Sequence, residues 1–237
     1  MPVQQPVAIV FDTFGTVVDW RSSLIAELTA FGRERNITTD WTALVDGWRA
    51  AYHPSMDRVR KGDLPWTKLD VLHRMALDKL VADFKISGLT EADLRHINLG
   101  WHRLHGWPDS VPGLTRLKRR FIIGPLSNGN VSLLTNMAKF AGLPWDMVFG
   151  SDLFGHFKPD PETYLGVARL LDLEPGQVMM AAAHNGDLAN ARRVGLMTAF
   201  FPRPKEYGPH QKRDTAAEHD WDVVATDIED LATKLGC

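Results

Sequence analysis

Short apolar runs, three of which stop abruptly at polar residues, constrain the fold of this 237-residue chain more than any other feature. Runs of about 4–8 apolar and β-branched residues are typical of strands buried on both faces of a parallel sheet. Helical patterns follow several of them, and one helix is predicted to start with Asp160 as N-cap and Pro161 in its first turn. Strands that alternate with helices predict an α/β fold with a Rossmann-like parallel sheet. The runs are 7–11, 121–126, 178–183, 197–201 and 221–225, and the helices are 131–140, 161–171 and 188–194.

The stretch from about residue 20 to residue 105 breaks this alternation. It has no convincing strand and instead shows amphipathic helical patterns, at roughly 22–35, 40–60, 66–85 and 90–105. Such an insert after the first strand would cover the strand ends as a cap. We therefore expect an α/β core domain formed by 1–19 and 106–237, and a helical cap subdomain formed by 20–105.

Composition excludes several classes of protein. Lys and Arg number 27 against 29 Asp and Glu, and this near-neutral balance argues against a nucleic-acid binder. No apolar run approaches the roughly 18 residues of a membrane span. The start, Met1–Pro6, lacks the basic region of a secretory signal, so we expect a cytoplasmic protein. Cys237 is the only cysteine, which excludes an internal disulfide and a zinc–thiolate cluster.

Polar residues stand where three of the apolar runs stop: Asp12, Ser127 with Asn128, and Asp187. In open parallel sheets ligands bind beyond the carboxyl ends of the strands, so these residues are expected to meet there. Lys158 lies in a fourth loop, just before a predicted helix. An ammonium group beside a carboxylate favours the ionised form that attacks carbon or phosphorus. The sequence therefore predicts a nucleophilic site at this edge of the sheet.

Four motifs in this order resemble those of the haloacid dehalogenase superfamily. The helical insert also falls where that superfamily carries its cap. The superfamily contains phosphatases, phosphonatases and dehalogenases, so the resemblance to its fold does not decide the activity. The motifs are Asp12-Thr-Phe-Gly-Thr16, Ser127-Asn-Gly, Lys158-Pro-Asp-Pro and Asp187.

Phe14 separates these activities better than any other residue. The phosphatase members have a second aspartate at this position, whereas the L-2-haloacid dehalogenases have an aromatic residue, as here. A phenyl group can neither protonate a leaving group nor bind Mg²⁺. A departing halide needs no proton, while phosphoryl transfer without a metal leaves its charge uncompensated. The resemblance therefore implies a metal-independent L-2-haloacid dehalogenase that uses no cofactor.

The resemblance also implies roles for the polar residues. Asp12 would attack C2 of the substrate and form an ester, while Thr16 and Lys158 position and stabilise its carboxylate. Water would then hydrolyse the ester, oriented or deprotonated by Asp187, with His184 as a second candidate. The best-known dehalogenases have serine and asparagine in the stretch before the aspartate, so the group that activates the water stays open.

Substrate and halide contacts are expected from a second set of residues. Arg49 resembles the halide-accepting arginine of the dehalogenase cap, and a guanidinium offers a permanent charge and several donors. Asn128 would share the halide with it, and Ser127 would hold the substrate carboxylate together with backbone amides. The expected aromatic lining consists of Phe14, Trp48, Trp66 and Tyr164.

Other interpretations compete for some residues. Asp187 could be the N-cap of a helix from 188, and Arg49 could be a surface residue. His102 and His105 have the helical spacing of metal ligands, but a third ligand is not evident, so an ordinary helix surface is expected. The basic segment 203–213 is predicted to be a surface loop that could attract an anionic substrate.

The predicted reaction is hydrolysis of small (S)-2-haloalkanoic acids to 2-hydroxy acids, with haloacetates such as fluoroacetate among the candidate substrates. Two alternatives stay open at this point: a Mg²⁺-dependent phosphatase of the same superfamily, and a catalytically degenerate binding module. The expected partners are the anionic haloacid and the halide product. The residues leave the oligomeric state open, and a homodimer is implied by the resemblance alone. No nucleic acid or membrane is expected as a partner.

Overall fold

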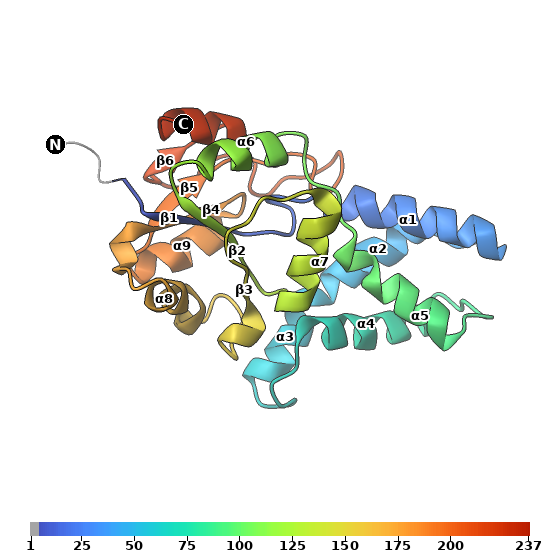
Figure 1. Cartoon of the computed structure of the whole chain (residues 1–237). Helices are drawn as coiled ribbons and strands as arrows, with labels where there is room; N and C mark the ends of the chain where they lie inside the picture. Colours follow the sequence, from blue (N-terminus) through green and yellow to red (C-terminus); the bar gives the residue numbers. More distant parts are fainter. Residues whose placement is uncertain (1–4) are drawn as a thin grey trace.

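The structure is a computed structural model that describes residues 5–237 (Figure 1). The prediction made from Met1–Pro6, that the chain lacks a secretory signal, therefore lies partly outside the described part of the chain. Six strands form a single parallel sheet with the order β3-β2-β1-β4-β5-β6. This order is that of the Rossmann doubly wound fold, and it confirms the predicted α/β fold. The strands are β1 (Ala8–Phe11), β2 (Ile122–Ser127), β3 (Phe149–Gly150), β4 (Val178–Ala182), β5 (Met197–Phe200) and β6 (Val223–Val224).

The two outer strands differ from the prediction. β3 has only two residues, too few to form a recognisable apolar run, and it was not predicted. β6 is shorter than the predicted 221–225, because only its two residues pair with β5, at Ala199 and Phe200. The four longer strands carry the predicted apolar runs.

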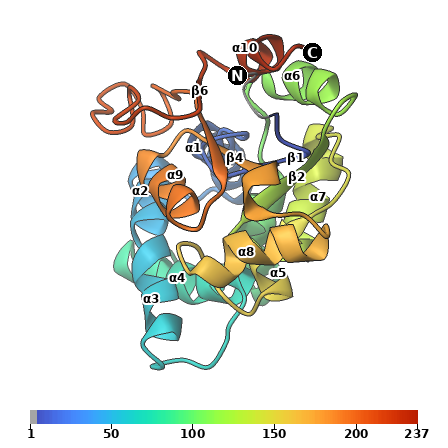
Figure 2. The same cartoon turned by 90° about the vertical axis from the view of Figure 1, so that its left-hand side faces the viewer.

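Alternate residues of the central strand β1 contribute to two separate cores, which explains why the whole strand is apolar. Ile9 and Phe11 pack on one face of the sheet, and Ala8 and Val10 pack on the other. Helices α6 (Ser110–Leu117), α7 (Val131–Ala141) and α10 (Ile228–Lys234) contribute to the first core. Helices α8 (Pro161–Leu170) and α9 (Asn185–Arg193) contribute to the second, and Figure 2 looks onto this side of the sheet.

The chain between β1 and β2 is helical throughout its regular elements, and α1–α5 lie together beyond one end of the sheet (Figure 1). The helix predicted over 40–60 is two helices. Pro54 lacks an N–H group, and its ring would clash with the carbonyl group of Ala50, so the chain breaks at Ala51. The helices are α1 (Trp20–Arg35), α2 (Trp41–Ala50), α3 (Tyr52–Arg60), α4 (Leu69–Asp83), α5 (Glu91–Asn98) and a short 3₁₀ helix (Leu99–His102).

One predicted helix start is confirmed and one alternative is wrong. Asp160 is the N-cap of α8 and Pro161 is its first residue, as predicted, although the Asp160 side chain makes no capping hydrogen bond and pairs with Arg60 at 3.3 Å and His156 at 3.2 Å. Asp187 does not cap a helix from 188, because α9 already begins at Asn185 and His184 is its N-cap. The Asp187 carboxylate is thereby free for other contacts. None of the helices within residues 5–237 is long and apolar enough to cross a membrane.

The position of a strand in the sheet predicts its sensitivity to truncation. Ile9→Ala removes a fully buried side chain from the central strand, and we expect the free energy of unfolding to fall by about 2–5 kcal/mol. Val224→Ala, on the edge strand with 44% of its surface exposed, is the control and should change it by no more than about 0.5 kcal/mol. Urea unfolding followed by circular dichroism measures both; equal losses would contradict this picture.

Candidate active site

Parallel pairing brings the ends of three strands to one place. Asp12 directly follows β1, Asn128 follows β2, and His184 comes two residues after β4. The backbone N–H of Asp12 donates to the carbonyl oxygen of Ala181 at 3.0 Å, which continues the β1–β4 ladder by one residue. The crevice between β1 and β4 lies where the strand order reverses, the usual ligand position in doubly wound sheets.

Lys158 joins two carboxylates inside the protein. Its ammonium group donates to Oδ1 of Asp12 at 3.0 Å and also to Oδ2 of Asp187. Its own backbone is held in turn: the N–H group donates to Oδ1 of Asn128 at 2.6 Å, and the carbonyl oxygen accepts from Arg60. Since the amide oxygen of Asn128 is engaged by this contact, its Nδ2 is the atom left to contact a ligand.

The second carboxylate oxygen of Asp12 has two partners. The Thr16 hydroxyl donates to Oδ2 at 2.8 Å and accepts from the N–H of Ala183 at 3.0 Å, which fixes the direction of its proton. Nδ1 of His184 lies 2.9 Å from the same oxygen, and Nε2 of His184 lies 2.8 Å from Oε2 of Glu206. Oδ1 of Asp12 therefore has one hydrogen-bond donor and Oδ2 has two.

These contacts fix the charge of the group. Burial alone would raise the pKa of Asp12, but the ammonium of Lys158 and the hydrogen bond and charge of His184 hold it well below its usual range. Burial would lower the pKa of Lys158, and Asp12 and Asp187 raise it above its usual range. Burial would likewise lower the pKa of His184, but Glu206 and Asp12 raise it well above 6.5. The site thus holds an ionised aspartate, an ammonium and an imidazolium.

Both oxygens of Asp187 are engaged. Tyr164 donates its hydroxyl proton to Oδ1 at 2.6 Å, and Lys158 occupies Oδ2. Burial, together with the charge of Asp187, raises the pKa of the Tyr164 hydroxyl, so it stays a donor. The phosphatase members of the superfamily would place Mg²⁺ near these carboxylates, but this donor set does not fit the ion. An ammonium already bridges Asp12 and Asp187, and Phe14 adds an aromatic ring where an oxygen ligand is needed.

The described residues contain no group of three or more His, Asp, Glu or Cys side chains arranged to hold a metal ion. His102 is buried, contrary to the helix surface expected for it. Its Nε2 lies 3.0 Å from Oδ1 of Asp70, and its Nδ1 lies 3.0 Å from Nδ2 of Asn136. His105 lies against the ring of Phe140, with 5.0 Å between ring centroids. The two histidines thus have separate structural contacts.

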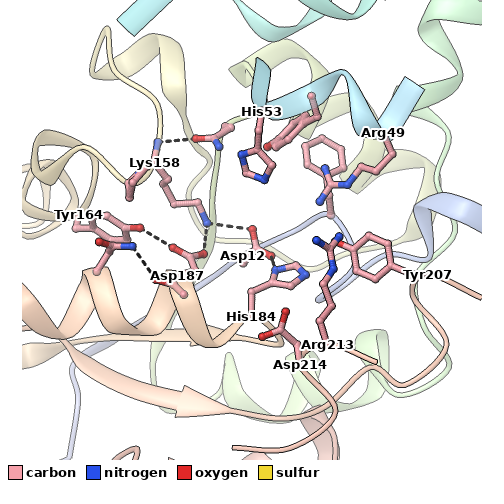
Figure 3. A pocket seen from close by; sticks show the side chains of 16 residues that line it. Asp12, Arg49, His53, Lys158, Tyr164, His184, Asp187, Tyr207, Arg213 and Asp214 are labelled. Atoms are coloured by element: carbon pink, nitrogen blue, oxygen red, sulfur yellow. Dashed lines mark hydrogen bonds and ion pairs between the residues drawn. The ribbon is translucent and has the colours of Figure 1, made fainter. Parts of the chain in front are cut away.

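A cavity of about 270 Å³ opens over the ionised group (Figure 3). This volume suits a small molecule, below the range typical of drug-sized ligands. Eight of the predicted site residues line it: Asp12, Phe14, Arg49, Asn128, Lys158, Tyr164, His184 and Asp187. Thr16 contacts Asp12 from behind without lining the cavity.

Arg49 provides a buried positive charge at the cavity wall. Its guanidinium lies 4.3 Å from the ring centroid of Tyr52 and 5.3 Å from that of Trp20. One nitrogen lies 3.9 Å from Oε1 of Glu206, whereas Nη1 is buried and has no hydrogen-bond partner among residues 5–237. A buried cationic donor without a partner is costly unless an anion meets it. Arg49 is therefore suited to meet an anion, and with its side chain only 11% exposed it is not a surface residue.

Three predicted contacts are not made with the cavity. Trp48 is fully buried, and its indole N–H donates to the carbonyl oxygen of His73 at 2.9 Å. Trp66 is 39% exposed and packs at a tilt against the ring of Phe157 outside the cavity. The hydroxyl of Ser127 accepts from the N–H of Gly129, two residues further on. The lining expected from these tryptophans is supplied by other aromatic residues, and Ser127 stabilises a turn.

Sequence reasoning missed several lining residues. Tyr52 and His53 follow Arg49 at the start of α3, one helical turn away from it. Tyr207 and Arg213 come from the segment that follows β5, and the guanidinium of Arg213 lies 3.7 Å from the ring centroid of Tyr207. Figure 3 shows Arg49 and Arg213 pointing into the same space beside Tyr207. No motif marked these residues, although the basic composition of 203–213 was a signal.

The basic segment 203–213 is only partly a surface loop. Arg203 is buried and donates two hydrogen bonds of 2.8 Å to the carboxylate of Asp109. Glu206 is also buried, at 1% exposure, and accepts from the indole N–H of Trp20 at 3.0 Å. These two anchors hold Tyr207 and Arg213 over the strand ends, so the segment forms one wall of the cavity.

The sheet order and the lysine-bound carboxylate at the end of β1 define an α/β protein with the haloacid dehalogenase fold. A family model of haloacid dehalogenase-like hydrolases matches residues 7–182, most of the chain. The protein belongs to this family.

Its relatives carry more specific names. An (S)-2-haloacid dehalogenase of Xanthobacter autotrophicus is 28% identical over 206 residues, which cover 83% of this chain and 75% of that protein. The solved structure of a defluorinating L-2-haloacid dehalogenase is 49% identical, with a TM-score of 0.95, covering 98% of this chain and 96% of its own. A further L-2-haloacid dehalogenase structure is 52% identical, also with a TM-score of 0.95, covering 98% and 99%.

The pKa of Asp12 tests the electrostatics of the site directly. Wild-type Asp12 should stay ionised as the pH falls through 3.8, the ordinary value. Lys158→Met removes the attracting charge while burial persists, so the pKa of Asp12 should rise toward or above 3.8. Carboxyl ¹³C NMR, assigned with Asp12→Asn, measures the change.

Lys118→Met is the matched control, because Lys118 is a half-exposed lysine that pairs with Asp146 away from the cavity. It should leave the Asp12 titration unchanged. An unchanged Asp12 pKa in Lys158→Met would show that the Lys158 ammonium does not keep the Asp12 carboxylate ionised.

Proposed function

We propose that this protein is a metal-independent hydrolase that converts small (S)-2-haloalkanoic acids into 2-hydroxy acids. The observation that carries the proposal is the pairing of two features in one small cavity: the ionised Asp12 and the buried Arg49 nitrogen without a partner. A carboxylate nucleophile and a waiting anion donor are what displacement of a halide from carbon requires. The names of the three relatives described above, each a haloacid dehalogenase, support the same reaction.

In the first step an oxygen of Asp12 attacks C2, and the carbon–halogen bond breaks with its electron pair on the leaving halide. Oδ1 suits this attack better than Oδ2, because it carries one hydrogen-bond donor instead of two. Arg49 and Nδ2 of Asn128 receive the anion. Backside attack inverts the configuration at C2 and leaves an ester of Asp12.

In the second step water attacks the ester carbonyl carbon of Asp12. Asp187 accepts a proton from this water, and the Lys158 ammonium, in contact with both Asp187 and Oδ1, gives a proton to the oxygen of the departing 2-hydroxy acid. Asp187 then returns its proton to Lys158, which restores the carboxylate and the ammonium. The other water proton leaves from the regenerated Asp12 carboxyl. Thr16 and Lys158 position Asp12 throughout. In place of Ser127, Arg213 at the cavity wall is suited to hold the substrate carboxylate.

The side chains around Asp12 argue against the phosphatase alternative. Phosphoryl transfer relies on cations around the phosphate and on in-line positioning, and Phe14 with the ammonium-bridged carboxylates offers no place for Mg²⁺. A binding module would not need an ionised aspartate held by a buried lysine. The helices of 20–105 as a cap, a homodimer and a cytoplasmic location stay predictions from the sequence.

Replacing the nucleophile tests the covalent route. Asp12→Asn removes the attacking carboxylate, and halide release from 2-chloropropionate should fall by about 10⁴-fold or more, the scale of removing a catalytic nucleophile. In wild type, single turnover in ¹⁸O water should place label in Asp12, read by mass spectrometry of the peptide. Label found in the product alone would exclude the ester.

Substrate class and metal dependence are tested together. Halide release from (S)-2-chloropropionate, chloroacetate and fluoroacetate should be unaffected by EDTA, because the residues around Asp12 supply all the charges needed. Phosphate release from small phosphate esters should not exceed that of Asp12→Asn. Phosphatase activity abolished by EDTA would favour the phosphatase, and turnover of neither class would favour a binding module.

A further inference from the structure

Glu206 is the least expected residue beside the nucleophile. It lies on the segment after β5, nearly 200 residues from Asp12, and its side chain is 1% exposed. A carboxylate buried this deeply is expected to have charged or hydrogen-bonding partners, because burying an unpaired charge is costly. Its Oε2 lies 2.8 Å from Nε2 of His184, and its Oε1 accepts from Trp20 at 3.0 Å.

The backbone of the loop that follows Asp12 is shaped around the Glu206 carboxylate. Gly15 has a φ of +87°, and a Cβ atom built there would lie 2.1 Å from the carboxyl carbon of Glu206. A side chain at this position would therefore collide with Glu206 and also strain the backbone. Glycine three residues after Asp12 lets Glu206 approach the loop, and the indole N–H of Trp107 holds the loop by donating to the Gly15 carbonyl oxygen.

His184 lies between two carboxylates arranged in the same way. It contacts Oδ2 of Asp12 and Oε2 of Glu206 through its two ring nitrogens. The other oxygen of each carboxylate faces a cation: Lys158 at Oδ1 of Asp12, and Arg49 at 3.9 Å from Oε1 of Glu206. With a carboxylate at each nitrogen, both nitrogens donate, and the ring has no lone pair left to accept a proton.

We propose that Glu206 is a positioning residue that keeps His184 as an imidazolium, so that His184 donates a hydrogen bond to Oδ2 of Asp12 throughout the reaction instead of acting as the base. This rests on the proposed function. When Oδ1 has attacked carbon, Oδ2 becomes the carbonyl oxygen of the ester. Water attack at the carbonyl carbon then moves an electron pair onto Oδ2, where Nδ1–H of His184 and the Thr16 hydroxyl stabilise the charge.

The chemistry explains why a second carboxylate is needed. Ester formation neutralises Asp12, and His184 loses the partner charge at Nδ1. Glu206 then remains as the carboxylate in contact with the ring and preserves its proton. Without Glu206 neither ring nitrogen of the histidine would contact a carboxylate once Asp12 is esterified, and the ring would give up its proton. Glu206 thus matters most for the second step. The charged groups around His184 are Asp12, Glu206, Lys158, Arg49, Asp187, Arg213 and Asp214.

Glu206→Gln tests this by separating the two steps. The burst of halide from (S)-2-chloropropionate should stay within a few-fold of wild type, while ester breakdown slows by about 10²–10³-fold at pH 8, the scale for losing an oxyanion donor. The covalent adduct should accumulate, seen by intact-protein mass spectrometry. Breakdown should recover as the pH is lowered and His184 regains its proton. If His184 were the base, losing its proton would maintain or speed breakdown, and this outcome would overturn the proposal.

Asp109→Asn is the matched control. It makes the same acid-to-amide change at the other anchor of the segment, where Asp109 holds Arg203, but it leaves the contact of Glu206 with His184 intact. It should lower the melting temperature without changing the ratio of the two steps or the pH profile. Equal slowing of both steps at every pH in Glu206→Gln would indicate a purely structural role and would also overturn the proposal.

A measurement that does not depend on activity distinguishes failure of the Glu206 proposal from failure of the proposed dehalogenation. Imidazole ¹⁵N NMR, with His184 assigned from His184→Gln, should show a ring that stays doubly protonated well above pH 6.5 in wild type. In Glu206→Gln the same ring should titrate at lower pH. A wild-type His184 that titrates near 6.5 overturns the role of Glu206. Absence of halide release with a protonated His184 would instead refute the proposed dehalogenation.

Discussion

The ammonium group of Lys158 is the interaction on which the site depends. It is buried, and it lies between the carboxylates of Asp12 and Asp187, which would otherwise repel each other in a poorly solvated pocket. Removing one member of a buried, paired group of charges leaves the others uncompensated. The lysine therefore has two effects that cannot be separated: it permits two anions to be placed together, and it keeps one of them ionised for attack.

The fold supplies this arrangement at little cost because parallel strands end at the same edge. β1 provides Asp12, the loop after β2 provides Asn128 to hold the backbone of Lys158, and the loop after β4 provides His184. Each of these follows a strand that is buried on both faces, which fixes its place at the sheet edge. The cavity walls come from longer connections, the helices after β1 and the segment after β5, which set the size of the cavity and bring Arg49, Glu206 and Arg213 to the nucleophile.

Local signals explain which parts were predictable. The four longer strands are continuous apolar runs, and the site residues that follow them are separated from the runs by a sharp change in polarity. β3 gives no such signal with two residues, and the break at Ala51 required attention to Pro54 within an otherwise continuous helical pattern. In the same way Trp48 and Trp66 were wrongly assigned to the cavity lining, because helical periodicity does not tell which of several apolar neighbours a side chain meets.

Glu206 shows the limit of sequence reasoning most clearly. It belongs to no strand-end motif, and its neighbours suggested only a basic loop. Its importance follows from a coincidence in space: a glycine beside the nucleophile, a histidine after β4 and a glutamate after β5 meet at one point. His184 introduces a charge beside the nucleophile that needs a counterion once Asp12 is esterified. A second carboxylate behind the histidine meets that need, so the two residues are best understood as one unit, and a change in either alone should unbalance the charge at the nucleophile.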